Sequence, residues 1–303
     1  MRIGVTGAAS IFTRKWLPLF EKDERVKLVG VGRRKIDENE DRFSQRSGYY
    51  CFDKHEIDMV YIPLPNNMHY DISKYYLKKE INVLVEKPCS LSLSKTRELT
   101  EIANEKKVFI KESFQWGSHM RTKKLIEICN THEVYLVDII FTMPHLSESD
   151  IRYKKELDGG AIADLGSYIC SVLSILFPNE NFELQSDFYK WNGNKQVDIG
   201  GTGFFLNAEK SKKINFYYAF GKSYESRITI HTQNGRFDIN QPFTHGNQMP
   251  AVINHEFNTI IKQEKFLDCH FESLLNELIS NPIPFSINHE TMLQAELLNQ
   301  LNK

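Results

Sequence analysis

The first residues whose types and spacing suggest chemistry form a glycine turn near the N-terminus. Gly7 follows the apolar run Arg2–Thr6 and stands where the dinucleotide-binding fingerprint begins, while Ala9 and Phe12 occupy its second and third glycine positions. Such a turn lets the backbone approach a pyrophosphate at the start of a helix. Taken alone, the segment also fits a plain strand–turn–helix. The residues expected along the phosphates are Gly7, Ala8, Ala9, Ser10 and Ile11.

Two adjacent arginines, Arg33 and Arg34, follow the second β-branched run, Val26–Val31. An NAD-binding domain usually has an acidic residue about 20 residues beyond the glycines to hold the ribose 2′-hydroxyl, but here the first acid is Asp37. Guanidinium groups suit a 2′-phosphate, which they hold by charge-assisted forked hydrogen bonds. The pair therefore predicts a preference for NADP(H) over NAD(H), and the alternative is a solvated basic turn.

Further polar residues follow the third and fourth predicted strands, at the carboxyl ends where open α/β sheets bind ligands. Pro65, Asn66 and His69 come after the run Ile57–Ile62, and Glu86-Lys87-Pro88 comes after Asn82–Val85. His69 has an equal alternative as a residue that caps or packs its own helix.

A second chemical pattern lies on the helix predicted at Ala161–Phe177. Asp164, Tyr168 and Ser171 share one stripe because positions i, i+4 and i+7 lie close together on a helix. The opposite stripe is apolar, so we expect one face against a sheet and the other toward a cleft. The alternatives are a core aromatic role for Tyr168 and a first-turn helix acid for Asp164. The apolar stripe comprises Leu165, Ile169, Val172, Leu173 and Leu176.

In order and spacing, these pieces resemble the glucose–fructose oxidoreductase/inositol dehydrogenase/MocA family. The matching segments are Pro65-Asn66-x-x-His69, Glu86-Lys87-Pro88, Phe114-Gln115-Trp116 and Gly159-Gly160-Ala161-x-x-Asp164-x-Gly166-x-Tyr168. The resemblance implies a nicotinamide-dependent oxidoreductase of sugars, cyclic polyols or related carbonyls.

The resemblance also implies roles for individual residues. Lys87 contacts the nicotinamide ribose and the substrate, Pro88 follows a cis peptide, Asp164 orients, and Tyr168 transfers a proton. A tyrosine hydroxyl has an ordinary pKa of about 10, so it needs a nearby cation to act as an acid–base group. Lys87 is the natural cation if the two domains close. The residues expected at the cofactor beyond the glycine turn are Arg33, Arg34, Pro65, Asn66, His69, Glu86 and Lys87.

The elements that must position these residues change in kind along the chain. Strand and helix patterns alternate over residues 1–115, which predicts parallel βαβ units. Several consecutive β-rich runs between residues 134 and 240, including Leu184–Lys190, predict an antiparallel sheet, and helices are expected at Val252–Gln263 and Glu290–Leu301. The predicted fold is α/β, with a doubly wound Rossmann domain at 1–118 and an α+β domain with a large, mainly antiparallel sheet at 119–303. The last helix is expected to pack back toward the first domain.

Composition excludes several classes of protein. The 303 residues include 38 Lys+Arg and 39 Asp+Glu, a net charge of −1 that gives no basis for nucleic-acid binding. The five scattered cysteines form neither a disulfide framework nor a zinc pattern, and the histidines suggest no metal site. The longest apolar stretch is about half of what a bilayer span requires. We therefore expect a cytoplasmic protein without a membrane partner.

The leading hypothesis is an NADP(H)-dependent dehydrogenase or reductase that transfers a hydride between nicotinamide and a sugar-like or cyclic hydroxyl or ketone substrate. The alternative is a non-catalytic NADP-binding regulator on the same scaffold, since the glycine turn is degenerate. The resemblance further implies a homodimer or homotetramer formed through the C-terminal sheet. The sequence leaves open the substrate, including whether its sugar is nucleotide-linked, and the direction of the reaction.

Overall fold

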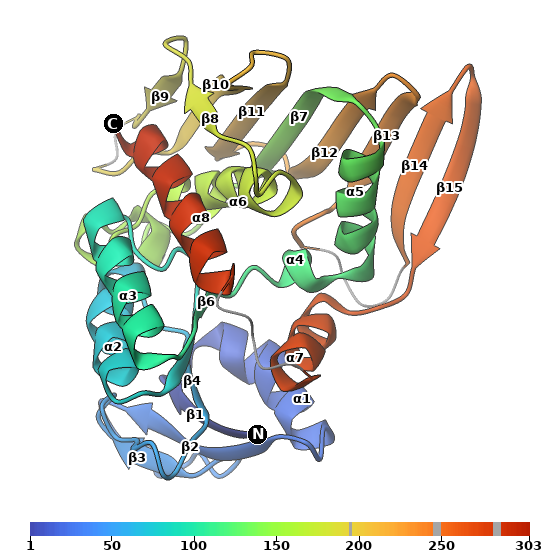
Figure 1. The fold of residues 1–303 in the computed structure, drawn as a ribbon. Coiled ribbons are helices and arrows are strands. Elements are labelled where there is room, and N and C mark those ends of the chain that lie inside the picture. Colours follow the sequence, from blue (N-terminus) through green and yellow to red (C-terminus); the bar gives the residue numbers. More distant parts are fainter. Residues whose placement is uncertain (194–195, 245–249, 281–285) are drawn as a thin grey trace. The chain divides into compact units, whose positions relative to one another are not determined.

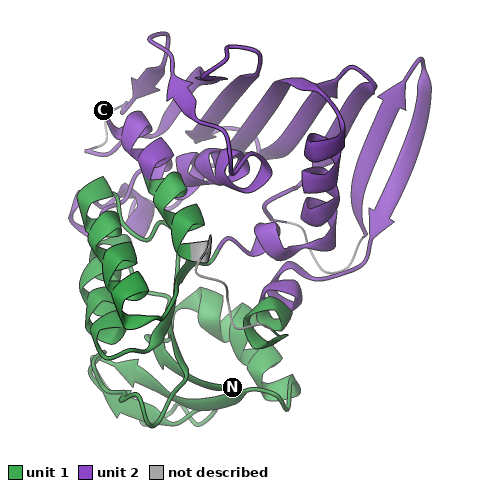
Figure 2. Ribbon diagram, viewed as in Figure 1, with its two compact units in different colours: residues 1–113, 275–295 green, residues 114–274, 296–303 purple. Residues whose placement is uncertain are grey.

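The computed structural model describes residues 1–303 except 194–195, 245–249 and 281–285. The chain forms two compact units, shown in Figure 2. Unit 1 comprises residues 1–113 and 275–295, and unit 2 comprises residues 114–274 and 296–303. The first unit is therefore assembled from two separate segments of the chain, and its first segment ends five residues before the boundary expected at residue 118.

Unit 1 is built on a six-stranded parallel sheet, sheet A, in the order β3-β2-β1-β4-β5-β6 (Figure 1). This order is that of a doubly wound dinucleotide-binding domain, and the predicted Rossmann fold is confirmed. The connections reverse direction between β1 and β4, and ligands of such sheets bind beyond the carboxyl ends of the strands at that point. The strands are β1 (Arg2–Thr6), β2 (Lys27–Arg33), β3 (Gln45–Ser47), β4 (Met59–Ile62), β5 (Asn82–Val85) and β6 (Ile110–Glu112).

Helices cover both faces of sheet A because the central strands are apolar on both faces. On β4, Val60 and Ile62 belong to the core formed with α2 (Asn66–Lys78) and α3 (Leu93–Lys106). Tyr61, between them, packs its ring on Trp16 of η1 (Phe12–Trp16) at 5.3 Å between ring centroids. η1 continues into α1 (Leu17–Lys22). Successive side chains of one strand thus join two separate cores.

The edge strand β6 is completed by residues from the C-terminal part of the chain, where α7 (His270–Ser280) and α8 (Ser286–Asn302) lie. Asn288 Oδ1 accepts a hydrogen bond from Ile110 N at 3.1 Å, and Thr291 Oγ1 donates to Ile110 O at 3.2 Å. Both side chains are buried. The N–H and C=O that Ile110 would offer to a seventh strand are therefore satisfied by two side chains.

Unit 2 is built on a nine-stranded sheet, sheet B, in the order β15-β14-β13-β12-β7-β11-β10-β8, with β9 paired to β10. Among the described strands of sheet B, only β7 and β11 pair in parallel, so the prediction of a large, mainly antiparallel sheet is confirmed. The strands are β7 (Val134–Met143), β8 (Phe182–Leu184), β9 (Tyr189–Trp191), β10 (Gly200–Asn207), β11 (Lys213–Phe220), β12 (Glu225–Thr232), β13 (Gly235–Asn240), β14 (Ala251–Phe257) and β15 (Ile260–Phe266).

Two predictions for unit 2 are wrong. The helix expected at Val252–Gln263 is the β14–β15 hairpin, whose turn residues Asn258 and Thr259 both have positive φ, 48° and 64°. That turn geometry matches the twist of the two strands. The single strand expected at Leu184–Lys190 is instead the end of β8, a turn, and the start of β9.

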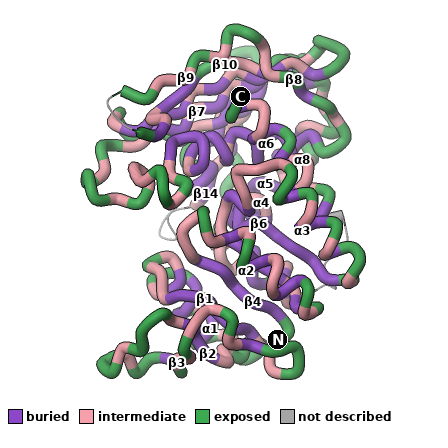
Figure 3. The backbone as a smooth tube through the Cα atoms, turned by 90° about the vertical axis from the view of Figure 1, so that its left-hand side faces the viewer, coloured by how far each residue is buried: buried purple, intermediate pink, exposed green. Residues whose placement is uncertain are grey.

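The helices of unit 2 include α4 (Gln115–Ser118), α5 (Met120–Thr131), η2 (Ile151–Tyr153), η3 (Lys155–Leu157), η4 (Ile162–Gly166) and α6 (Ser167–Leu176). The five residues of the predicted apolar stripe are all buried. The helical stretch Lys155–Leu176 is long and apolar enough to cross a membrane, but most of it is buried inside the protein, as in the core helix of a folded domain. Figure 3 shows this burial along the chain.

Candidate active site

The turn after β1 has the geometry that a phosphate-binding turn requires. Gly7 has φ of 95°, a backbone conformation that favours glycine, and a Cβ there would lie 2.6 Å from Leu64 Cδ2. Gly7 N donates to Gly32 O at 2.7 Å. A helix begins at Ser10, and the first N–H groups of a helix have no acceptor within it. The turn therefore presents N–H groups at the carboxyl edge of sheet A.

A cavity of about 640 Å³ opens beside this turn, at the ends of β1 and β2. It brings together residues predicted from two separate parts of the sequence, the glycine turn and the arginine pair. Lys35 and Tyr49 line it as well, and neither was predicted as a site residue. Lys35 extends the basic run, whereas nothing in the local sequence marks Tyr49. The lining residues are Gly7, Ala8, Arg33, Arg34, Lys35 and Tyr49.

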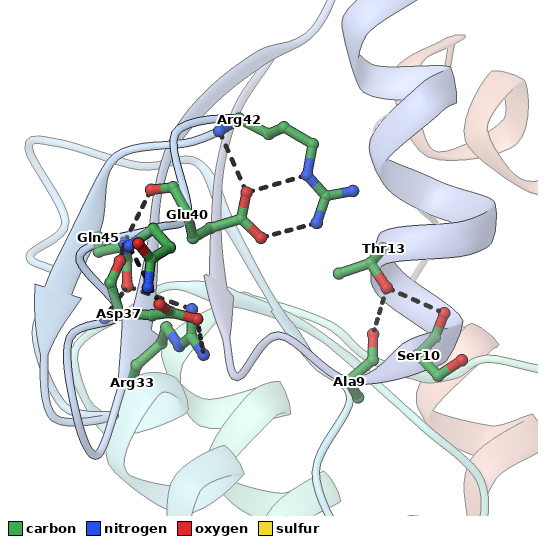
Figure 4. Close-up of polar contacts among 9 residues, drawn as sticks. Ala9, Ser10, Thr13, Arg33, Asp37, Glu40, Arg42 and Gln45 are labelled. Atoms are coloured by element: carbon green, nitrogen blue, oxygen red, sulfur yellow. Dashed lines mark hydrogen bonds and ion pairs between the residues drawn. The ribbon is translucent and has the colours of Figure 1, made fainter.

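The two arginines differ in their surroundings, as Figure 4 shows for Arg33. Arg33 Nη1 donates to Gln45 Oε1 at 3.2 Å, and its Nη2 lies 3.6 Å from Asp37 Oδ2. Asp37, the first acid after the pair, is thus directed at Arg33. Arg34 is exposed, and within the described part of the chain it has no ion pair with a carboxylate. Arg34 is therefore the more available cation in the cavity.

The residues after β4 fix the neighbouring loop. Pro65 is the residue before the first turn of α2, Asn66 begins the helix, and His69 lies in its first turn. The His69 ring is fully buried, with Nδ1 2.8 Å from Pro88 O and Nε2 2.7 Å from Leu64 O. His69 therefore links the loop after β4 to the loop after β5.

The loop after β5 carries the predicted lysine. The Lys87–Pro88 peptide is cis, as expected. Glu86 Oε1 accepts a hydrogen bond from the Tyr61 hydroxyl at 2.7 Å, and burial raises the pKa of Glu86 against the opposing effects of Tyr61 and Lys87. Directly after Pro88, Cys89 N donates to Glu112 Oε1 at 2.6 Å. Glu112, at the end of β6, was not predicted as a site residue.

The predicted Asp164 is held by an ion pair within unit 2. Arg152 Nε donates to Asp164 Oδ2 at 2.6 Å, and Arg152 Nη1 lies 3.3 Å from Asp150 Oδ1. Asp164 raises the pKa of the Arg152 guanidinium, and burial opposes this effect. Arg152 was missed by sequence reasoning, which had no reason to pair a residue of a short 3₁₀ turn with the helix that follows.

The start of that helix is fixed by Asp198, which precedes β10. Asp198 Oδ2 accepts a hydrogen bond from Ile162 N at 2.8 Å, and Asp198 O accepts one from Ala161 N at 2.9 Å. Gly160 has φ of 121°, and a Cβ there would collide with the Asp198 carboxylate. Burial raises the pKa of Asp198 to about 6, against the N–H groups of the helix. This helix therefore begins where a distant carboxylate caps it.

Tyr168 lies about one helical turn after Asp164 and is partly buried in a cluster of aromatic rings. Its ring centroid is 5.4 Å from that of Phe114, 5.2 Å from Phe141 and 4.9 Å from Phe243. Ser171, the third member of the predicted polar stripe, is buried and accepts a hydrogen bond from Trp116 Nε1 at 3.0 Å. The stripe therefore holds two partly exposed residues, Asp164 and Tyr168, and a buried anchor.

Comparisons with known proteins agree with this description. Residues 1–114 match the model of the GFO_IDH_MocA family, described as an oxidoreductase family with an NAD-binding Rossmann fold. A dTDP-3,4-didehydro-2,6-dideoxy-alpha-D-glucose 3-reductase from Saccharopolyspora spinosa is 29% identical over 87% of this chain and 81% of its own. D-xylose 1-dehydrogenase (NADP(+)) 2 from Haloferax volcanii is 22% identical over 88% of this chain and 84% of its own.

Among solved structures, KijD10, a 3-ketoreductase from Actinomadura kijaniata in complex with NADP and TDP-benzene, superposes with a TM-score of 0.85. The match covers 99% of this chain and 96% of KijD10 at 20% sequence identity. At that identity, the likeness shows the fold alone.

Proposed function

Because residues 1–114 belong to the GFO_IDH_MocA oxidoreductase family, we propose that this chain is an NADP(H)-dependent oxidoreductase of sugar-like carbonyl and hydroxyl groups. The observation that carries the proposal is the basic cavity beside Gly7, where Arg33, Arg34 and Lys35 meet the glycine turn. A bound 2′-phosphate needs cations there, whereas an NAD site needs a carboxylate free to accept from the 2′-hydroxyl. Asp37 is directed at Arg33, which supports the NADP assignment.

The residues present fit this cofactor at its adenosine and pyrophosphate ends. Gly7 has no side chain and adopts a φ of 95°, so its backbone can approach a phosphate closely. Ala8, Ala9, Ser10 and Ile11 supply N–H groups at the start of the helix, Tyr49 offers an aromatic wall, and the arginines supply charge. Toward the nicotinamide end we assign Pro65, Asn66, His69, Glu86 and Lys87.

For the substrate, we propose a ketosugar, which is reduced with NADPH as the hydride donor. Four relatives that are 25–29% identical to this chain carry the name dTDP-3,4-didehydro-2,6-dideoxy-alpha-D-glucose 3-reductase. A nucleotide-linked 3-ketosugar is therefore the first substrate to test, and D-xylose with NADP⁺, the reaction that the Haloferax volcanii relative is named for, is the second.

In the proposed mechanism, the nicotinamide would supply or accept the hydride when bound, and residues of the chain donate or accept the proton. Tyr168 donates a proton to the oxygen of the carbonyl being reduced, since it is a partly exposed residue on the otherwise largely buried helix α6. Asp164, clamped by Arg152, holds negative charge one turn before Tyr168 and orients this end of the helix. Lys87 supplies positive charge from the cis turn after β5 and contacts the substrate.

The test combines cofactor titration with a turnover assay. We expect NADPH to bind more tightly than NADH in a fluorescence titration, and NADPH to be oxidised at 340 nm in the presence of a dTDP-linked 3-ketosugar. Binding of NADPH without turnover of the ketosugars, free sugars and polyols in the panel would favour the alternative, a regulator that binds NADP. Failure to bind either nicotinamide would refute both functions.

We also propose that the protein is cytoplasmic and forms a homodimer or homotetramer through sheet B. All five cysteines are free thiols, as is usual in a reducing compartment. On sheet B, residues of β7, β10, β11 and β12, among them Asp138, Asn215 and Tyr217, line a cavity of about 420 Å³. Light scattering tests the assembly, which should give two or four times the chain mass of 35.4 kDa.

A further inference from the structure

Two buried side chains hold the backbone immediately after Lys87. The His69 ring lies 2.8 Å from Pro88 O, and Glu112 Oε1 accepts a hydrogen bond from Cys89 N at 2.6 Å. His69 is fully buried, and Glu112 is 8% exposed. The two residues that follow Lys87, Pro88 and Cys89, are therefore held in place by side chains from α2 and β6.

Glu112 reaches this turn because of the strand register. β6 pairs in parallel with β5, Glu112 lies opposite Val85, and Ser113 N donates to Val85 O at 2.8 Å. Glu112 is thus the last residue of its strand, next to the point where the chain leaves β5 for Glu86 and Lys87. From there its carboxyl group extends past the end of β5 and meets the first N–H after Pro88.

We propose that Glu112 is a positioning residue for Lys87, because its carboxyl group anchors the turn that aims this lysine. It acts through the Cys89 N–H, two residues from Lys87, and has no contact with the substrate. The effect on turnover rests on the proposed function, in which Lys87 contacts the substrate. The anchoring itself rests only on the geometry within unit 1.

The charged groups around Glu112 make its anchoring sensitive to pH. Burial raises the pKa of Glu112 to about 8; the Cys89 N–H opposes this, Glu290 of α8 raises the pKa further, and Lys87 and Lys111 lower it. The carboxyl group is therefore mostly protonated at pH 7 and ionises as the pH rises through about 8. In both forms an oxygen can accept from Cys89 N, but only the ionised form is a charge-assisted acceptor and an anion near Lys87.

The experiment compares Glu112→Ala with Glu112→Gln. Glutamine keeps an oxygen acceptor for Cys89 N and removes the ionisation, whereas alanine removes both. Glu80→Gln is the matched control, since Glu80 pairs with Lys54 at the surface of the same unit. The readouts are hydrogen exchange of the Cys89 amide, the dissociation constant of NADPH, and turnover of the ketosugar as a function of pH.

We expect Glu112→Ala to speed exchange of the Cys89 amide at least tenfold and to lower kcat by up to about 100-fold, which a misplacement of about 1 Å can cause. The loss of NADPH affinity should be much smaller than the loss of kcat, because the arginine cavity at the adenosine end of the cofactor is untouched. Glu112→Gln should restore both amide protection and most of kcat at pH 7, and should lack the inflection near pH 8 that we expect for the unmodified enzyme.

Several results would overturn the proposal. Unchanged Cys89 exchange in Glu112→Ala shows that the carboxyl group does not anchor the turn, and equal damage from glutamine and alanine shows that accepting this hydrogen bond is not its role. Amide exchange needs no substrate, so it separates the two proposals. If the unmodified protein turns over no substrate, the proposed function fails while exchange still decides the anchoring.

Discussion

The two cavity arginines allow a sharp test of the cofactor assignment. Arg34 is exposed, whereas Arg33 is engaged by Gln45 and Asp37. Replacing Arg34 with alanine removes the more available cation and leaves the hydrogen bonds of its neighbour intact. We therefore expect Arg34→Ala to weaken NADPH selectively, with little change in NADH, which lacks the 2′-phosphate.

The magnitude follows from the contact that is lost. A hydrogen bond to a charged group contributes about 1.5–3 kcal/mol, and each 1.4 kcal/mol is a factor of ten. One lost contact with the phosphate therefore weakens NADPH by at least about tenfold. Arg33→Ala should weaken NADPH binding by a similar factor. It should also leave Asp37 without its arginine partner, so that the Asp37 carboxylate repels the phosphate and can accept a hydrogen bond from the ribose hydroxyl of NADH. The double variant should bind NADPH no better than NADH.

The assay is the dissociation constant of each nicotinamide, measured by fluorescence at low and at high salt. The preference for NADPH should shrink with salt, because the Debye length falls from about 30 Å at 0.01 M to about 3 Å at 1 M. Arg42→Ala is the matched control, since Arg42 pairs with Glu40 in the same loop and is not among the residues lining the cavity. Equal dissociation constants for NADPH and NADH in the unmodified protein at low salt, or equal effects of Arg34→Ala and Arg42→Ala, would refute the assignment.

Three further changes test the remaining parts of the site and the fold. Tyr168→Phe should lower turnover by about 10²–10⁴ without loss of thermal stability, the usual span of acid–base catalysis, and near-normal turnover with rate-limiting chemistry would exclude Tyr168 as the proton donor. Asp198→Ala should cost about 0.5–2 kcal/mol of unfolding free energy through the lost helix cap. Asp198→Asn keeps an acceptor for Ile162 N but cannot ionise. In the unmodified protein the free energy of unfolding should fall as the pH rises from 3.8 to about 6, because the native state still holds a proton on Asp198 that the unfolded chain has released. Asp198→Asn should remove this decline. Asn288→Ala leaves Ile110 N buried without its acceptor and should cost about 1–3 kcal/mol in denaturant unfolding, whereas Asn302→Ala, exposed on the same helix, should change little.

Local patterns predicted the fold well where local chemistry decides it. The alternation of apolar runs and helices up to Lys111 predicted five of the six strands of sheet A, all except β3, and the five-residue apolar stripe that begins at Leu165 predicted the buried face of the core helix. The β14–β15 hairpin was missed because its turn, Asn258-Thr259, lacks the glycine that usually marks a two-residue hairpin. A β-branched threonine with positive φ is a conformation that sequence reasoning has no ground to expect.

Of the candidate site in unit 1, the sequence could point only to the residues that follow the ends of predicted strands. Gly7, the arginine pair and Lys87 stand at strand ends, and strand ends can be located from the pattern of apolar runs. Glu112, Asp198 and Tyr49 lie beside residues from distant parts of the sequence: Cys89, the start of the helix at Ala161, and the glycine turn at Gly7, respectively. Their own neighbours in the sequence carry no signal of those contacts, so only a three-dimensional structure reveals them.

The capping of β6 by Asn288 and Thr291 has a consequence for how the protein is made. Thr291 is 181 residues beyond Ile110 in the chain. At about 5–20 residues per second, a ribosome needs roughly 10–40 s to synthesise that stretch. During this interval the nucleotide-binding sheet is complete in its strands but has an open, hydrogen-bonding edge. A nascent chain in this state is a substrate for chaperones and for wrong strand pairing, and truncation before Asn288 makes that exposure permanent.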